Sequence, residues 1–187
     1  MVKKKTCIFI SGHGSNLKSL IRNSRNNNFP INIKLVVSNN RYARGIVFAK
    51  QNSIPVLIFN TKKRNFENNI LQQIKKYNIS LICLAGYMKI ISKKFISSYG
   101  RKIINIHPSL LPKFKGLNTY ERALKNREKK MGCTVHFVNN KLDSGKIIIQ
   151  KSFFIDKYDD VDNLKKKTQD LEKTAYSEAI IKIFRYN

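Results

Sequence analysis

The sequence predicts an α/β fold, a doubly wound and mostly parallel sheet of about seven strands with helices on both faces. Two observations predict this fold. Short apolar runs alternate with segments whose apolar residues recur every three or four positions, which is how strands and helices alternate around a parallel sheet. The run at 80–85 is almost continuously apolar, as in a strand buried on both faces. In such folds ligands bind at the carboxyl ends of the strands.

The first strand, 5–10, enters a glycine turn at 11–16, and Leu17, Leu20 and Ile21 then share one helix face. Further strands are predicted at 31–37, 55–59, 80–85, 102–106, 132–138 and 147–154. Further helices are predicted through Ile46 and Ala49, and at 66–77, 90–99, 118–126 and 161–184. An irregular loop is expected at 109–116, and turn residues at 139–145 join the last two strands.

Length and composition limit the class of protein. A chain of 187 residues with 42% hydrophobic residues is predicted to form one globular domain, 1–187. No apolar stretch approaches the roughly 18 residues that a membrane helix needs, and the apolar run after the N-terminal lysines is too short for a signal peptide. We therefore expect a cytoplasmic protein with no membrane contact. Cys7, Cys83 and Cys133 lie in separate apolar runs, so they are expected to be reduced core residues.

The net charge of +26 is the feature that most suggests a nucleic-acid partner, because Lys and Arg contacts with phosphate dominate that affinity. The basic residues, however, are spread along the whole chain, and Lys outnumbers Arg about threefold although Arg reads bases and phosphates better. Asn and Ile are also abundant, which favours a drift in base composition as the cause. Nucleic acid is therefore not the expected partner.

The glycine turn is the first candidate site. Gly12, Gly14, Ser15 and Asn16 lie between a strand and a helix, where backbone N–H groups attract phosphate. Leu17 occupies the place of the third glycine in a dinucleotide-binding fingerprint, and the turn lacks the Gly-Lys-Ser/Thr of a P-loop. The turn thus suits a phosphomonoester, although a plain strand-to-helix turn capped by Ser15 remains open at this point.

The second candidate site is at the end of the predicted strand 102–106. Asn105 and His107 point the same way because side chains alternate along a strand. An amide donor beside an imidazole suits oxyanion stabilisation and proton transfer. Asp143, in a loop after a later strand, is predicted to raise the imidazole pKa and to orient the ring if the two lie close together. His13 and His136 are expected to be a loop variation and a packed strand residue.

Four motifs, in this order and spacing, carry a resemblance to a known family. They are Ser-Gly-His-Gly-Ser-Asn at 11–16, Leu-Ala-Gly-Tyr-Met-Lys-Ile at 84–90, Asn-Ile-His-Pro-Ser-Leu-Leu-Pro at 105–112 and Leu-Asp-Ser-Gly at 142–145. Together they resemble the glycinamide ribonucleotide formyltransferases of purine biosynthesis over essentially the whole chain. The third motif alone is shared with other formyltetrahydrofolate-dependent enzymes.

The resemblance implies a formyltransferase fold whose N-terminal part binds the ribonucleotide phosphate and whose C-terminal part is catalytic and binds folate. It implies the catalytic residues Asn105, His107 and Asp143. It implies that the substrate contacts Gly14, Ser15, Asn16, Gln169 and Glu172. It implies that folate contacts Arg64, Met88, Lys89, Ile90, Ile91, Asn105, Asn139, Asn140, Lys141, Leu142 and Asp143. From the residues alone, Met88 and Ile91 also fit a core role and Arg64 a solvated basic face.

The implied reaction moves a formyl group from 10-formyltetrahydrofolate, as cosubstrate, to glycinamide ribonucleotide, with no metal. Both partners are small molecules, and the protein is expected to be a monomer or weak homodimer. A proline is usual in the family where Lys115 stands, and histidines are common at Asn118 and Tyr120, so the loop is expected to be more mobile. Two alternative functions remain, a methionyl-tRNA formyltransferase and a catalytically silent nucleic-acid-binding protein. For the first of these, a C-terminal RNA-binding domain would be expected.

Overall fold

A computed structural model describes residues 2–60 and 65–185 of the chain. Seven strands form one sheet in the order β3-β2-β1-β4-β5-β6-β7. The pairs β1–β2, β1–β4 and β2–β3 are parallel, and β6–β7 is antiparallel. The predicted α/β class with about seven mostly parallel strands is therefore confirmed. The chain divides into two compact units, residues 1–104 and 105–187, with the division inside β5 (Lys102–His107).

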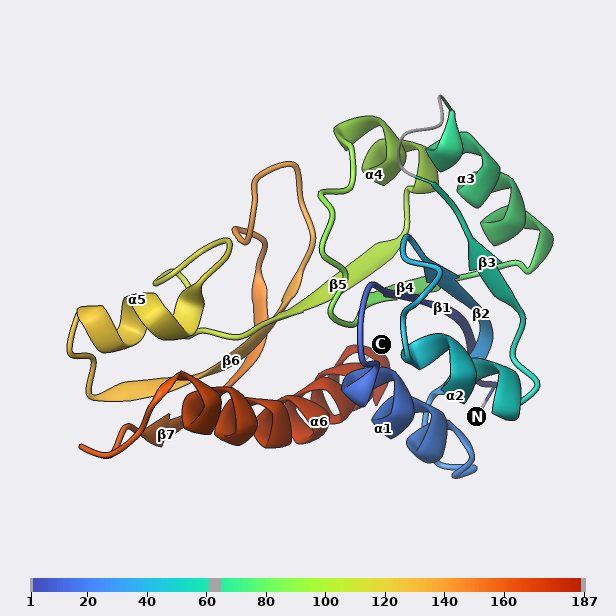
Figure 1. Cartoon of the computed structure of the whole chain (residues 1–187). Coiled ribbons are helices and arrows are strands. Elements are labelled where there is room, and N and C mark those ends of the chain that lie inside the picture. The colour runs from blue at the N-terminus through green and yellow to red at the C-terminus, as the bar shows by residue number, and fades with distance from the viewer. Residues whose placement is uncertain (1, 61–64, 186–187) are drawn as a thin grey trace. The chain divides into compact units, whose positions relative to one another are not determined.

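Unit 1 contains the strands β1 (Lys4–Ile10), β2 (Ile31–Ser38), β3 (Val56–Ile58) and β4 (Leu81–Leu84). In Figure 1, α1 (Ser15–Ser24) and α2 (Gly45–Gln51) lie on one side of these strands, and α3 (Phe66–Lys76) and α4 (Lys93–Tyr99) lie on the other. Because helices cover both faces, β4 is buried along its whole length and β1 and β2 along most of theirs, whereas β3 at the edge of the sheet is half-buried to exposed. Cys7 and Cys83 are buried free thiols, as predicted.

The start of α4 differs from the prediction of a helix from residue 90. Ser92 caps the helix, because its Oγ accepts a hydrogen bond from the Phe95 N–H at 3.0 Å. The Ser92 N–H in turn donates to Oε1 of Glu67 on α3 at 3.0 Å. The apolar residues at 90 and 91 therefore belong to an irregular segment before the helix. Apolar periodicity could not locate this start, because a tertiary contact with Glu67 fixes the cap.

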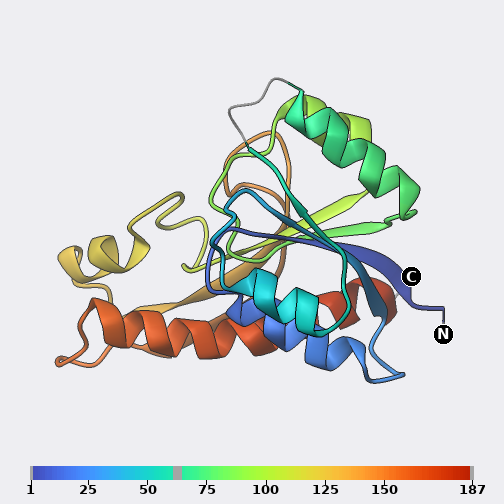
Figure 2. The same cartoon turned by 45° about the vertical axis from the view of Figure 1, so that its right-hand side comes forward.

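Unit 2 contains the end of β5, α5 (Thr119–Lys125), β6 (Lys130–Phe137), β7 (Ile147–Phe154) and α6 (Val161–Arg185). Helix α6 packs along β6 and β7 and also contacts α5, as Figures 1 and 2 show. Ala123, Met131 and Leu164 form a buried cluster that Phe114 and Tyr120 pack against. The buried thiol of Cys133 is also free. The two strands of the hairpin and the long helix match the predicted elements.

Candidate active site

The second half of β5 supplies two side chains of the candidate site, both within unit 2. Asn105 and His107 share one face of this strand because they are two residues apart. The Nδ2 of Asn105 lies 3.5 Å from Oδ1 of Asp143 and 3.2 Å from Nε2 of His136. The Nδ1 of His107 lies 3.4 Å from Oδ2 of Asp143. The three residues expected to be catalytic therefore form one cluster.

Asp143 reaches this cluster from the loop between β6 and β7, the orange loop in Figure 1. The base of the loop is closed by a hydrogen bond from the Phe137 N–H to the Lys146 carbonyl, at 2.9 Å. Gly145 packs so tightly on Phe137 that a Cβ at residue 145 would lie 1.7 Å from the Phe137 carbonyl oxygen. Only glycine fits there, which gives the Leu-Asp-Ser-Gly motif a steric reason.

His136 is a residue that the sequence analysis set aside and the structure brings into the cluster. Its Nδ1 lies 2.8 Å from the Phe137 carbonyl oxygen, which can only accept, so Nδ1 carries the proton. In a neutral ring Nε2 is then an acceptor for the Asn105 amide at 3.2 Å. The ring therefore orients the carboxamide of Asn105. A histidine one strand away from Asn105 carries no signal in the sequence, because the contact joins residues far apart in the chain.

The protonation of His107 differs from what was expected. Burial lowers the pKa of His107 below its usual 6.5, although the bond to the Phe114 carbonyl and the Asp143 charge oppose this fall. The prediction that Asp143 raises the imidazole pKa was thus right about the effect of the carboxylate and wrong about the net direction. A lowered pKa favours the neutral ring of His107. Sequence reasoning missed this because burial at 5% exposure is a tertiary property.

Asp143 stays ionised despite being 9% exposed. Burial would raise its pKa, but the neighbouring imidazole of His136, the bond from the Gly116 N–H and the neighbouring imidazole of His107 lower the pKa below its usual 3.8. The Gly116 N–H donates to Oδ2 at 2.9 Å. A carboxylate held by a backbone donor keeps both its charge and its orientation.

The loop between β5 and α5 passes directly beside this pair. Its first part is fixed by the buried Thr134, whose Oγ1 donates to the Ser109 carbonyl at 2.6 Å and accepts from the Leu111 N–H at 3.1 Å. In its second part, the Phe114 carbonyl lies 2.8 Å from Nε2 of His107. A carbonyl oxygen only accepts, so His107 carries its proton on Nε2 and turns the lone pair of Nδ1 toward Asp143.

The candidate phosphate turn lies in unit 1 at the carboxyl end of β1. Gly14, with φ of 78°, is the residue before α1, so the cap has no side chain and Ser15 does not cap the helix as an alternative reading had it. Ser11 ties the turn to neighbouring loops, because its Oγ donates to Asn39 Oδ1 at 2.6 Å and accepts from the Met88 N–H at 2.8 Å. The turn and the segment at 86–88 are therefore joined at one end of the strands.

The residues that the resemblance assigned to folate are divided between the two units. Met88 and Ile90 are 68% and 79% exposed in unit 1, so neither belongs to the core. In unit 2, Leu142 is exposed and the Lys141 N–H donates to Oδ1 of Asn139 at 2.9 Å. Arg64 lies outside the described residues. Lys89 and Asn140 are exposed, and Ile91 is half-buried.

The two expected substrate residues of α6 are Gln169 and Glu172. Gln169 is half-buried, and Glu172 is 8% exposed. The Glu172 charge adds to the effect of burial in raising the pKa of Tyr120 and Cys133, so its carboxylate lies close to both. On β6, Cys133 faces opposite to Thr134 because side chains alternate, so Glu172 lies across β6 from the face that carries Thr134. Its substrate contact stays a prediction.

Among residues 2–60 and 65–185, no group of three His, Cys, Asp or Glu side chains is arranged to hold a metal ion. No helix there is long and apolar enough to cross a membrane.

Comparison with known proteins places this arrangement in a family. The family described as Formyl transferase matches residues 4–180. The phosphoribosylglycinamide formyltransferase of Haemophilus influenzae is 40% identical over 179 residues, which cover 92% of this chain and 84% of that protein. The human trifunctional purine biosynthetic protein adenosine-3 is 36% identical over 95% of this chain, which spans only 18% of that protein.

Solved structures agree with the sequence matches. The phosphoribosylglycinamide formyltransferase of Brucella melitensis has a TM-score of 0.91 and 36% identity, covering 99% of this chain and 97% of that chain. The enzyme of the same name from Anaplasma phagocytophilum has a TM-score of 0.90 and 37% identity, covering 94% and 84%. With the family match spanning most of the sequence, this chain belongs to the formyl transferase family.

Proposed function

We propose that this chain transfers the formyl group of 10-formyltetrahydrofolate to the amine of glycinamide ribonucleotide in de novo purine biosynthesis. The observation that carries the proposal is the cluster of an amide donor, an imidazole and a carboxylate at Asn105, His107 and Asp143. The names of the relatives support formyl transfer to this acceptor. The membership of this chain in the formyl transferase family also supports a folate-derived formyl donor. That this donor is 10-formyltetrahydrofolate is our proposal.

The amide of Asn105 is suited to stabilise the charge that develops on the formyl oxygen during the transfer. The substrate amine attacks the formyl carbon, a new C–N bond forms, and the formyl oxygen gains negative charge. One N–H of Asn105 Nδ2 is held by Nε2 of His136, and the other, whose contact with Asp143 Oδ1 is long at 3.5 Å, is the donor that stabilises this oxygen. Fixed donors are most effective when they need not reorient during the reaction, which is what the contact with His136 provides.

The pair of His107 and Asp143 suits the proton transfer. The attacking amine must lose a proton, and the folate nitrogen must gain one as its C–N bond breaks. A proton that reaches the pair is held between Nδ1 of His107 and Oδ2 of Asp143, which lie 3.4 Å apart. The pair therefore takes up one proton from the amine and returns it to the departing folate nitrogen, so that no net proton is consumed.

Substrate binding follows the residues that the resemblance assigned. Gly14, Ser15 and Asn16 open α1 and present backbone N–H groups for the phosphate of the ribonucleotide. Among the residues assigned to folate, Met88 and Ile90 of unit 1 and Leu142 of unit 2 each present an exposed apolar side chain. The remaining assigned residues are Arg64, Lys89, Ile91, Asn139, Asn140, Lys141, Gln169 and Glu172. A single domain over residues 1–187, a cytoplasmic location and a monomeric or weakly dimeric state remain predictions.

The test is a direct assay with both substrates. Purified protein, 10-formyltetrahydrofolate and glycinamide ribonucleotide should yield the formylated ribonucleotide, detected by mass spectrometry, in equal amount to tetrahydrofolate. His107→Ala should slow turnover by about two to four orders of magnitude. Formyl transfer to methionyl-tRNA instead, or salt-dependent oligonucleotide binding without any transfer, would refute the proposal in favour of one of the two alternative functions.

A further inference from the structure

The segment 114–117 touches both members of the proposed proton-transfer pair through its backbone. The Phe114 carbonyl accepts from His107 Nε2 at 2.8 Å, and the Gly116 N–H donates to Asp143 Oδ2 at 2.9 Å. Two residues apart, these groups fix the tautomer of the imidazole and one oxygen of the carboxylate. The geometry of the pair therefore depends on how firmly this segment is held.

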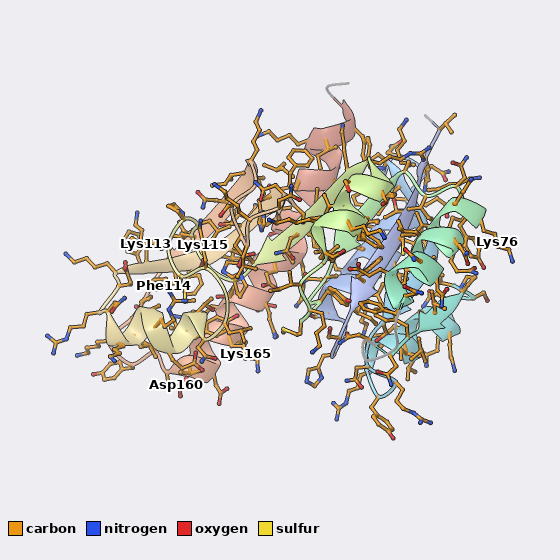
Figure 3. All side chains as sticks on the ribbon, turned by 90° about the horizontal axis from the view of Figure 1, so that it is seen from above. Lys76, Lys113, Phe114, Lys115, Asp160 and Lys165 are labelled. Carbon is orange, nitrogen blue, oxygen red and sulfur yellow. The ribbon has the colours of Figure 1, made fainter. Side chains whose placement is uncertain are left out.

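The backbone of this segment is in an unfavourable conformation. Phe114 has φ of 54°, in the left-handed region that a side chain with a Cβ disfavours, and Gly116 has φ of 78°. A phenylalanine keeps such a φ only where surrounding contacts determine it. Figure 3 shows Phe114 between Lys113 and Lys115 on this loop. Contacts beyond the pair itself must therefore stabilise the segment.

Arg122, on α5, makes three such contacts. Its guanidinium donates to the Lys115 carbonyl at 2.7 Å and to the Leu117 carbonyl at 3.3 Å. The same group lies 5.2 Å from the centre of the Phe114 ring. A planar guanidinium can bond carbonyl oxygens in its plane while its face covers an aromatic ring, and a lysine ammonium cannot do both.

We propose that Arg122 is a positioning residue for formyl transfer, which holds the segment 114–117 so that its backbone orients His107 and Asp143. This role deepens the proposed function and rests on it. Arg122 touches neither substrate in this proposal and acts through the Phe114 carbonyl and the Gly116 N–H. The contact of Lys115 Nζ with Ser144 Oγ at 2.6 Å ties the same segment to the Asp143 loop. Together these contacts hold the segment that was expected to be mobile.

Arg122 can affect the pKa of His107 in two ways, directly through its charge and indirectly by holding the Phe114 carbonyl in place, and the two effects have opposite signs. The positive charge of Arg122 slightly lowers the pKa of His107, whereas the bond to the Phe114 carbonyl raises it by more. Asp143 also raises this pKa, and His136 lowers it. If Arg122 acts only as a charge, Arg122→Gln raises the pKa of His107. If Arg122 positions the segment, the same substitution weakens the Phe114 bond and lowers the pKa.

The experiment combines a titration with kinetics. The chain contains three histidines, so the ring signals of His107 can be followed by NMR through a pH titration of the full-length protein. Arg122→Gln should lower the pKa of His107 and reduce kcat about tenfold or more, since small displacements of catalytic groups are costly, while KM for the folate stays within about twofold. Arg122→Lys keeps the charge but loses the planar guanidinium that bonds the carbonyls and covers the Phe114 ring. It should therefore lower the pKa of His107 and kcat by less than Arg122→Gln does.

Lys125→Gln is the matched control, because Lys125 and Arg122 are the two basic residues in the last turn of α5. It should leave the pKa of His107 and kcat unchanged. An unchanged or higher pKa in Arg122→Gln, or an equal effect of Lys125→Gln, would overturn the proposal. Should Arg122→Gln unfold, Arg122→Lys carries the same test. The titration needs no substrate, so a protein that transfers no formyl group refutes the proposed function while leaving this test to decide on positioning.

Discussion

Asp143→Asn is the most informative single substitution, because asparagine has nearly the same shape but can neither carry the charge nor share a proton. In the protein, Oδ2 accepts from the Gly116 N–H at 2.9 Å and lies 3.4 Å from His107 Nδ1. The other oxygen accepts from Asn105 Nδ2 at 3.5 Å. An asparagine offers one oxygen and one NH₂ group, so in either orientation one of these donors meets another donor.

The size of the effect follows from this geometry. Without the carboxylate, a proton on His107 Nδ1 has no charged partner, so the pair can no longer hold the proton between the amine and the folate nitrogen. Loss of general acid–base help corresponds to about two to four orders of magnitude in kcat, which is about 3–5 kcal/mol in the activation free energy. One mismatched buried donor lowers the free energy of unfolding by about 1–3 kcal/mol. The protein should therefore remain folded.

The assay compares kcat and both KM values for the wild type, Asp143→Asn and the control Asp162→Asn, which changes an exposed carboxylate in the first turn of α6. We expect the loss in kcat, with KM for the folate changed by less than about threefold, and no loss in the control. A folded Asp143→Asn protein with a wild-type kcat would show that Asp143 is no part of the proton path. A change confined to the folate KM would make Asp143 a binding residue.

Three further predictions concern the turn, the pH and the charge. Gly14→Ala should destabilise the fold, because its Cβ would lie 2.6 Å from Gly45 Cα at a φ of 78°. The added Cβ of Gly12→Ala would meet nothing within 4 Å, so this substitution should leave the fold intact and, in calorimetry, weaken binding of the ribonucleotide but not of the folate. Because the pKa of His107 is lowered in the folded state, the stability that the neutral ring contributes is complete above pH 6.5 and is lost as the pH falls through the folded pKa. Urea unfolding at several pH values should show this loss of stability in the wild type and a smaller loss in His107→Gln. The double replacement Lys76→Gln with Lys165→Gln, at two exposed lysines labelled in Figure 3, should change kcat/KM less than about twofold at physiological salt; a large loss would show that the positive charge has a function.

Most of the fold could be predicted because its signals are local. Continuous apolar runs such as Leu81–Leu84 and the apolar spacing in Phe66–Lys76 are set by residues that are neighbours in the sequence. The start of α4 could not be predicted, since Glu67 on another helix helps to fix the cap. The pattern of a segment thus identifies the element, while its boundary can depend on a distant side chain.

The candidate site was predictable in composition but not in electrostatics. Asn105 and His107 were predicted from their shared strand face, and Asp143 from its place in a loop after a strand; the resemblance then implied that all three are catalytic. The role of His136 and the lowered pKa of His107 were missed, because both depend on burial and on contacts across more than 30 residues of sequence. Arg122 was missed for a different reason, because its partners at Lys115 and Leu117 are backbone carbonyls, which carry no side-chain signature.

The two sides of the proposed proton-transfer pair are held by different means, and this has a mechanistic consequence. Asp143 sits in a loop that is fixed by backbone packing, where Gly145 lies against the Phe137 carbonyl with no space for a Cβ. The acceptor for His107 Nε2, in contrast, is the carbonyl of Phe114, in a segment held by the exposed side chain of Arg122. Phe114 and Asp143 both have a left-handed backbone, with φ of 54° and 45°, so the difference lies in the contacts that hold them. Exposed contacts are released more readily than core packing. We therefore expect any adjustment of the pair during formyl transfer to occur on the Phe114 side, with Asp143 as the fixed reference.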